Sequence, residues 1–172
     1  VSLTDNGTAL GVATRDWFKS GHESADKVYK AGADDILSVN YSSSQVFTDY
    51  AAAISWSDGE EVASGVETRR GLCTTGAGRI EIAVRVNADT GYIRLYTGCW
   101  RSTNTVTVYD MEGNVLATST PLSAGDSSVC KALTFKIDAA GASRVRIVIQ
   151  SSAERDNGNV SLSAVTVLGK KA

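Results

Sequence analysis

The sequence predicts an all-β domain, an antiparallel two-sheet β-sandwich of the jelly-roll kind spanning residues 1–172. Between Arg79 and Asp110, apolar residues recur at every second position, the spacing of a strand with one dry and one wet face. Clusters of Asn, Asp, Gly and Ser, which favour turns, separate short segments rich in Val, Ile, Thr and Tyr. Eight or more such segments at about ten-residue spacing are typical of a sandwich.

The regular stretch from Arg79 to Asp110 predicts three consecutive antiparallel strands in the middle of the sandwich. Their inward positions are apolar, so the residues between them should share one outward face that carries tyrosines and arginines. The expected strands are 79–86, 92–100 and 106–110, and the outward residues include Tyr92, Arg94, Tyr96 and Tyr109.

The remaining strands are less regular at the start of the chain and clearer at its end. In the first third we expect strands within 1–12, 16–21, 27–29, 36–41, 45–50 and 54–56, with at most one helical turn around 24–28. Later strands are expected at 66–73, 114–118, 133–137, 145–149 and 160–167, the second of them pairing back on 106–110. The apolar phase of the last strand shifts near Ala164, which indicates a β-bulge.

Composition excludes several classes of function. Lys and Arg number 17 against 19 Asp and Glu, a net charge of −2, so no nucleic-acid partner is expected. No apolar run approaches the ~20 residues of a membrane-spanning helix. The chain opens at Val1 with neither Met nor a signal peptide, so we expect a segment of a longer protein.

Three cysteines and a single histidine make a zinc site improbable by composition. Cys73, Cys99 and Cys130 form no C-x-x-C pair, and only His22 is available as an imidazole ligand. Two interpretations remain: three small buried thiols, or one disulfide between two of them.

The predicted outward face has the chemistry of a sugar-binding surface. Aromatic rings stack on the apolar C–H face of a pyranose, and Arg or Asn side chains supply directional hydrogen bonds. The predicted ligand-binding residues are Trp100, Tyr96, Arg94, Arg101, Asn104 and Tyr92, with Trp100 as the main platform. The alternatives are an ordinary solvated sheet face and, for Trp100, a cap over the strand end.

Four landmarks, in order along nearly the whole chain, resemble a galactose-binding-like jelly-roll module of secreted bacterial glycoside hydrolases. They are Asp16-Trp17-x-x-x-Gly21 with Lys30-Ala31, the Ser55–Gly59 segment, the Ala88–Thr90 turn followed by 93–98, and the closing 158–165 segment. The family commonly has a His-Trp pair where this chain has Lys19 and Ser20, and Gly or Tyr at Cys99 and Trp100. The landmark residues Trp17 and Trp56 are expected in the core.

The resemblance implies a non-catalytic carbohydrate-binding module. Its partners would be a polysaccharide or glycan and a catalytic domain in the same parent chain, and its location secreted or cell-surface. The alternative is a structural or protein-interaction module. No enzyme is expected, because the adjacent acidic pairs Asp34-Asp35 and Glu60-Glu61 suit solvated turns better than two opposed catalytic carboxylates.

The resemblance also implies a possible structural calcium. Calcium takes six to eight oxygen ligands. The segment from Asn87 to Gly91 starts like a calcium loop but lacks the closing Glu, so a helix-loop-helix site is excluded. Asp5, Asp156 and Asn159 would supply ligands if the terminal strands pair.

Overall fold

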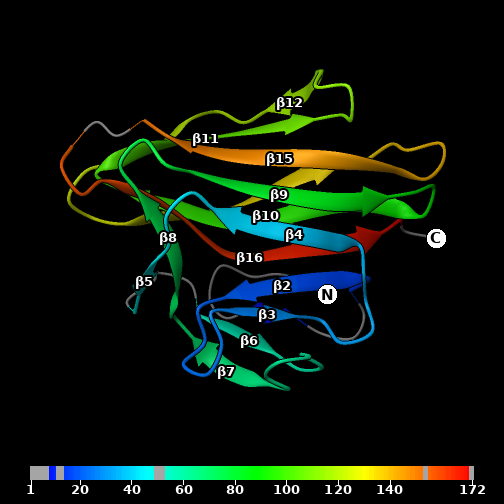
Figure 1. The fold of residues 1–172 in the computed structure, drawn as a ribbon, viewed down its shortest axis with the longest axis horizontal. Coiled ribbons are helices and arrows are strands. Elements are labelled where there is room, and N and C mark those ends of the chain that lie inside the picture. The colour runs from blue at the N-terminus through cyan, green and yellow to red at the C-terminus, as the bar shows by residue number, and fades with distance from the viewer. Residues whose placement is uncertain (1–7, 11–13, 49–52, 153–154, 171–172) are drawn as a thin grey trace.

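The computed structural model describes residues 8–10, 14–48, 53–152 and 155–170. These residues form sixteen strands and no helix, and most of the strands lie in two large sheets that face each other (Figure 1). Within the same residues, nothing has the length and apolar character of a membrane-crossing helix. The predicted all-β sandwich is therefore confirmed, as is the strand expected at 27–29, which is β3, and the helical turn allowed around 24–28 does not form.

The first large sheet is antiparallel, and its order is β12-β11-β15-β9-β4, with β13 also pairing to β11. Its strands are β4 (Ile36–Tyr41), β9 (Arg79–Val86), β11 (Ser102–Tyr109), β12 (Val115–Thr118), β13 (Leu122–Ala124) and β15 (Ser143–Ser151). The hairpin of β11 and β12 is the one predicted from the sequence.

The second large sheet follows the order β14-β10-β16-β2-β3, with β8 pairing to β16 and β5 to β8. Its strands are β2 (Asp16–Ser20), β3 (Lys27–Tyr29), β5 (Gln45–Phe47), β8 (Gly71–Thr75), β10 (Thr90–Trp100), β14 (Val129–Lys136) and β16 (Asn159–Gly169). The predicted segment 66–73 is split, because its first part belongs to β7 of a third sheet.

The main core lies between the two large sheets and is built from the residues that the alternation placed inward. Burying one Ile, Val or Leu side chain fully contributes roughly 1.5–3 kcal/mol. Fully buried members of this core include Ile80, Ile82, Val84, Ile93, Leu95, Val106, Ile147, Ile149, Val165 and Val167.

The three central strands do not pair with one another, so the expected single outward face is wrong. Strand β9 pairs with β15 and β4, β10 with β14 and β16, and β11 with β15. The chain therefore crosses between the sheets at each turn, as jelly-roll connections do. Alternation fixes which side of a strand is buried but does not fix its partner. Tyr109 consequently lies on the opposite outer surface from Tyr92 and Arg94.

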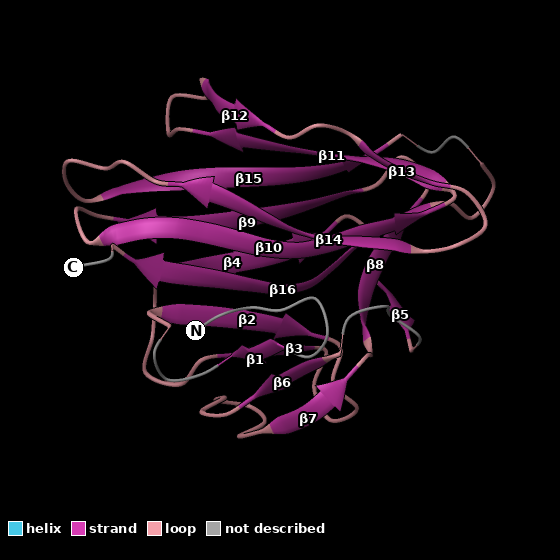
Figure 2. Ribbon diagram, turned by 180° about the vertical axis from the view of Figure 1, so that it is seen from behind, coloured by secondary structure: helices cyan, strands magenta, loops and turns pink. Residues whose placement is uncertain are grey.

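A third, small sheet covers part of the outer face of the second large sheet (Figure 2). Its strands are β1 (Thr8–Leu10), β6 (Ile54–Trp56) and β7 (Gly65–Thr68), and β1 runs parallel to β6. A second cluster of buried residues joins this sheet to the large one. The members are Trp17, Val28, Ile54, Trp56, Tyr96 and Ala164, so the prediction that Trp17 and Trp56 are core residues is confirmed.

Two local predictions have clear outcomes. The bulge in the last strand is confirmed, because Tyr96 pairs with Ala164 and Thr97 with Leu162, which leaves Ser163 as an extra residue. The structure shows no disulfide among the three cysteines, of which Cys73 and Cys99 are buried and Cys130 is partly buried, so it agrees with the interpretation without a disulfide. Most of the predicted strand within 1–12 and residues 49–52 lie outside the described part of the chain.

Candidate functional site

Strand β10 carries four of the six residues predicted to bind sugar, at alternating positions on its outer face. Tyr92, Arg94, Tyr96 and Trp100 share that face because side chains alternate along a strand. A strand rises ~3.3 Å per residue, so Arg94 and Trp100 are separated by roughly 20 Å. Side chains this far apart cannot all contact one sugar ring, so the predicted ligand-binding residues do not form a single subsite.

Tyr96 is not available to a ligand. Its side chain is 2% exposed and packs with Trp17 and Trp56 in the second buried cluster. It does point away from the main core, as predicted, but the small third sheet covers that part of the outer face. The sequence did not indicate this cover, because it comes from the irregular first third of the chain.

Asn104 is also buried, at 1% exposed. Its carboxamide nitrogen donates hydrogen bonds to Thr97 Oγ1 at 2.8 Å and to the carbonyl oxygen of Gly98 at 2.9 Å. These bonds tie the start of β11 to the end of β10. Asn104 is therefore a structural residue of β11, and the prediction that it contacts a sugar is wrong.

Trp100 remains partly exposed at the end of β10. Its indole N–H donates to the carbonyl oxygen of Asp126 at 3.1 Å, which fixes the orientation of the ring. The guanidinium carbon of Arg101 lies 4.4 Å from the ring centroid, in cation–π contact. Arg101 has a φ of 48°, the left-handed conformation that turns its side chain back over the preceding ring.

Asp126 joins the loops that meet around Trp100. Its carboxylate accepts from Arg101 Nε at 2.7 Å and lies 3.4 Å from Arg155 Nη1. We call Trp100, Arg101, Asp126 and Arg155 the Trp100 surface. Its members come from the β10–β11, β13–β14 and β15–β16 connections, and no sequence spacing linked Asp126 or Arg155 to Trp100.

Gly158 allows these loops to pack closely. A Cβ atom at this position would lie 2.2 Å from the carbonyl oxygen of Arg101. Real Cβ atoms do not approach backbone oxygen so closely, so only glycine lets the β15–β16 connection pass against Arg101. The Trp100 surface therefore depends on a residue that does not itself contact the indole.

Tyr92 and Arg94 form a separate group near the start of β10. Arg94 Nε donates to Thr134 Oγ1 on the neighbouring β14 at 2.7 Å. Tyr92 pairs across the strands with Lys136, and both line a shallow cavity of about 340 Å³ together with Asp138. These residues keep their predicted outward orientation but lie too far from Trp100 to act on the same ring.

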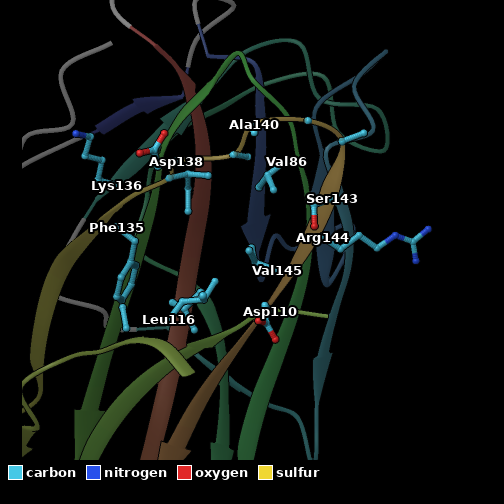
Figure 3. A pocket seen from close by; sticks show the side chains of 16 residues that line it. Val86, Asp110, Leu116, Phe135, Lys136, Asp138, Ala140, Ser143, Arg144 and Val145 are labelled. Atoms are coloured by element: carbon cyan, nitrogen blue, oxygen red, sulfur yellow. The ribbon is translucent and has the colours of Figure 1, made fainter. Parts of the chain in front are cut away.

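A larger cleft, of about 500 Å³, opens between the two large sheets at the end of the molecule remote from Trp100 (Figure 3). The sequence analysis did not identify it. Its interior is apolar, and charged residues lie only around its rim. The apolar lining includes Val86, Leu116, Phe135, Ile137 and Val145, and the rim includes Asp110, Lys136, Asp138 and Arg144.

Two ionisable side chains on β2, Asp16 and Lys19, are buried, and both have structural partners. Burial raises the pKa of Asp16 to about 6, although its carboxylate accepts the backbone N–H groups of Trp17 and Ile36, each at 2.7 Å. Burial lowers the pKa of Lys19 to about 7, and its ammonium donates to the carbonyl oxygens of Ser20 and Arg70. Neither group lines a described cleft.

Three of the four carboxylates considered for catalysis have structural partners. Asp34 pairs with Arg85 and Asp35 with Arg15, so these adjacent carboxylates are held by different neighbours. Glu61 accepts the backbone N–H of Tyr29 at 2.9 Å. Two carboxylates facing each other across a bound sugar are what glycoside hydrolysis requires.

The structure describes only part of the set of residues proposed to hold calcium. Asn87 Oδ1 accepts the backbone N–H of Asp89 at 2.9 Å, so it closes a turn. Among the described residues, no group of three or more His, Cys, Asp or Glu side chains is placed to hold a metal ion. Asp5 lies outside those residues, and the calcium site stays a prediction.

Two facing sheets of this kind define an all-β sandwich, and several solved structures with a similar fold are carbohydrate-binding modules. The CBM22-1 xylan-binding domain of Xyn10C from Paenibacillus barcinonensis matches with 13% identity and a TM-score of 0.47, over 93% of this chain and 97% of that one. The module CBM6cm-2 of lichenase 5A from Cellvibrio mixtus, in complex with cellotriose, matches with 12% identity and a TM-score of 0.43, over 92% and 99%.

Other comparisons extend beyond such modules or find nothing. The enzymatically active domain of tailspike protein 4 from bacteriophage CBA120 matches with 13% identity and a TM-score of 0.43, and the chain covers 77% of its own length but 19% of that domain. No family model and no curated protein matches the sequence. At these identities and TM-scores the similarities do not identify a ligand, which has to be argued from the site.

Proposed function

We propose that this protein is a non-catalytic carbohydrate-binding module that uses the Trp100 surface. The observation that supports this most is the partly exposed indole of Trp100, held in one orientation by its hydrogen bond to Asp126 and in contact with the guanidinium group of Arg101. A fixed aromatic ring beside hydrogen-bond donors is the usual recognition element for a pyranose.

Binding would combine stacking with directional hydrogen bonds. A sugar ring places its C–H face on the part of the indole that solvent reaches, and its hydroxyl groups meet Arg101, Arg155 and Asp126. Arg101 and Arg155 donate, while the Asp126 carboxylate accepts from hydroxyl groups. The ion pairs to Asp126, at 2.7 and 3.4 Å, hold both guanidinium groups in place before the ligand arrives, which lowers the entropy cost of binding.

A binding role without catalysis fits the carboxylates described above. Asp16 has a pKa raised to about 6, a property shared by many catalytic acids. It is nevertheless 2% exposed and saturated by two backbone N–H groups, so no substrate atom approaches it. We infer that its shift is a consequence of its structural position.

The biological role would be to hold a linked catalytic domain close to a polysaccharide, in a secreted or cell-surface protein. A tether of this kind raises the effective concentration of substrate around the enzyme without new catalytic groups. Such a module gains most when the individual site is weak, because the linkage supplies the remaining affinity.

Affinity gel electrophoresis against a panel of glycans, followed by calorimetry on any that retard the protein, tests this proposal. Trp100→Ala should lower the affinity for the bound glycan by about 5- to 30-fold, since aromatic stacking on a ligand ring contributes about 1–2 kcal/mol. Tyr109→Ala is the matched control: Arg146 stacks on Tyr109 at 4.6 Å on the other outer surface, so the same kind of pair is removed elsewhere.

The outcomes separate the alternatives. Retardation that survives in Trp100→Ala but is lost in Tyr109→Ala would move the site to the first sheet. No retardation by any glycan would favour a structural or protein-interaction module. The observation that favours this second function is the group of exposed apolar residues on the hairpin of β11 and β12, Met111, Val115 and Leu116.

A further inference from the structure

The end of β2 and the start of β8 lie side by side and are held in close contact (Figure 1). A Cβ atom on Gly21 would lie 2.5 Å from the Cα atom of Gly71, so the two backbones touch at this point. Gly21 also has a φ of 70°, a conformation that glycine adopts without steric cost. The hydroxyl oxygen of Ser20 accepts the backbone N–H of Leu72 at 3.1 Å. This contact fixes the position of the residues that flank the two glycines.

The flanking residues line a cavity of about 400 Å³. His22 follows Gly21, Arg70 precedes Gly71, and both belong to the cavity wall. A cavity of this volume falls within the usual range of small-molecule sites. The other polar residues of the wall are Glu23, Thr48, Thr68 and Arg69. Among the described residues of the wall, two guanidinium groups outnumber one carboxylate, although the whole chain has a net charge of −2.

The guanidinium group of Arg70 lacks a counter-ion within the described part of the chain. Its Nε atom is buried and has no hydrogen-bond partner there, and none of the ion pairs between described residues includes it. The side chain as a whole is only partly buried. Removing a charged group from water costs free energy unless an opposite charge compensates it. An anion in the cavity would provide this compensation for Arg70.

Lys19 adds positive charge behind the cavity wall. Its buried ammonium donates to the carbonyl oxygen of Arg70 at 2.7 Å and to that of Ser20. Both of these acceptors are neutral carbonyl groups rather than carboxylates. Burial lowers the pKa of Lys19 to about 7, and an anion bound nearby would favour its charged form. The same anion would therefore be stabilised by two cationic residues.

His22 contributes a hydrogen-bond donor whose ring is held in one orientation. Its Nδ1 atom accepts the backbone N–H of Ser24 at 3.0 Å, so the proton of the neutral ring resides on Nε2. The ring also packs edge-on against Trp56, with centroids 5.5 Å apart and an interplanar angle of 87°. These two contacts order the imidazole before a ligand arrives, which reduces the entropy cost of binding.

We propose that this cavity binds an oxyanion, namely the carboxylate or sulfate group of an acidic sugar. The planar guanidinium of Arg70 matches two oxygens of such a group, and His22 Nε2 is a further donor. The hydroxyl groups of Thr48 and Thr68 also line the cavity and can donate to the oxyanion or to the sugar ring. The oxyanion follows from the charges of the cavity, whereas its attachment to a sugar rests on the proposed function. The cavity and the Trp100 surface share no residue.

Titrations of the whole chain with glucuronate, glucose sulfate, inorganic sulfate and glucose test the proposal at constant pH and ionic strength. Calorimetry gives the affinities. Because His22 is the only histidine, its single imidazole signal in nuclear magnetic resonance spectra reports directly on this cavity. The signal should shift saturably with at least one of the two acidic sugars and stay in place with glucose. The acidic sugar that binds more tightly identifies the carboxylate or the sulfate as the preferred group.

Two substitutions of Arg70 separate its charge from its shape. Arg70→Gln should weaken binding of the acidic sugar by about 12- to 150-fold, the effect of losing a hydrogen bond between charged groups. Arg70→Lys keeps the charge but loses the planar pair of donors, so its affinity should lie between those of the wild type and Arg70→Gln. Arg144→Gln is the matched control, because it removes the same charge from an exposed arginine of β15, and it should bind like the wild type.

Several results would overturn the proposal. The absence of an imidazole shift with either acidic sugar would remove the site, and equal binding of glucose would remove its dependence on charge. Binding of inorganic sulfate but of neither acidic sugar would overturn the assignment to a sugar. Equal weakening by Arg70→Gln and Arg144→Gln would indicate unspecific attraction of anions. Glycan binding that depends on Trp100 while this cavity stays empty would contradict this inference and leave the proposed function intact.

Discussion

The ammonium nitrogen of Lys19 lies 2.7 Å from the carbonyl oxygen of Arg70, and the lysine side chain is completely buried. It also lies 5.9 Å from the ring centroid of Trp56. This contact ties β2 to the residue that directly precedes β8, so a charged group is held between the large second sheet and the small third sheet.

The first prediction concerns the pH dependence of stability. Burial depresses the pKa of Lys19 to about 7, below the ordinary value of 10.5, so the unfolded state binds more protons between these limits. The free energy of unfolding should therefore rise with pH above about 7, by roughly 1–2 kcal/mol between pH 7 and 8.5. Urea unfolding of the wild type and of Lys19→Met measures this rise.

In Lys19→Met this component of the rise should disappear, because no group with a depressed pKa remains at that position. Lys136→Met is the control, since Lys136 is exposed. If the wild type and Lys19→Met show the same slope between pH 7 and 8.5, Lys19 is not buried as an amine in solution.

The second prediction concerns Asp16, which joins β2 to β4. Its two carboxylate oxygens each accept a backbone N–H, from Trp17 and from Ile36. An Asn side chain offers a single acceptor oxygen, so Asp16→Asn should leave one buried N–H unsatisfied and destabilise the fold by about 1–3 kcal/mol. Thermal unfolding measures the loss, and an unchanged melting temperature would contradict it.

The third prediction separates the structural tyrosine from the proposed sugar site. Tyr96 is buried between the large second sheet and the small third sheet, so Tyr96→Ala should cost roughly 3–5 kcal/mol of stability. Glycan affinity per folded molecule should stay unchanged, in contrast to Trp100→Ala. Calorimetric binding at low temperature, corrected for the folded fraction, tells the two effects apart, and a selective loss of affinity in Tyr96→Ala would refute the structural role.

The fourth prediction tests how the Trp100 surface is supported. Gly158→Ala would place a methyl group 2.2 Å from the carbonyl oxygen of Arg101, which must then move. We expect a loss of about 1–3 kcal/mol in stability and altered Trp100 fluorescence. Gly125→Ala is the matched control: the carbonyl oxygen of Gly125 accepts the Arg101 N–H at 3.0 Å, but an added Cβ meets nothing within 4 Å. Equal effects of both substitutions would contradict the steric argument.

Much of the fold was predictable because alternation is a local property. The buried side of β9, β10 and β11 follows from the sequence alone, as do the hairpin of β11 and β12 and the bulge in β16. Strand partners were not predictable in the same way. A strand with one apolar face packs on the core equally well from either sheet, and the choice depends on the whole topology.

The site was predicted less well than the fold, for two physical reasons. Tyr96 is covered by the small third sheet, and Asn104 is buried against the end of β10. The sequence around each residue does not show this burial. Asp126 and Arg155 joined Trp100 from loops 26 and 55 positions further along the chain, and contacts over such separations leave no local pattern. Trp100 and Arg101 remain together in the proposed sugar site because they are adjacent in sequence.

One side of β16 pairs with β10, and the extra residue Ser163 divides the other side between two strands. Residues 159–162 pair with β8, and residues 164–167 pair with β2. Deleting Ser163 would shift one half of the strand by a single position and turn Val160 and Leu162 away from the main core. One unpaired residue thus lets a single strand pair antiparallel with two different strands, while both halves keep their apolar side chains in the same interior.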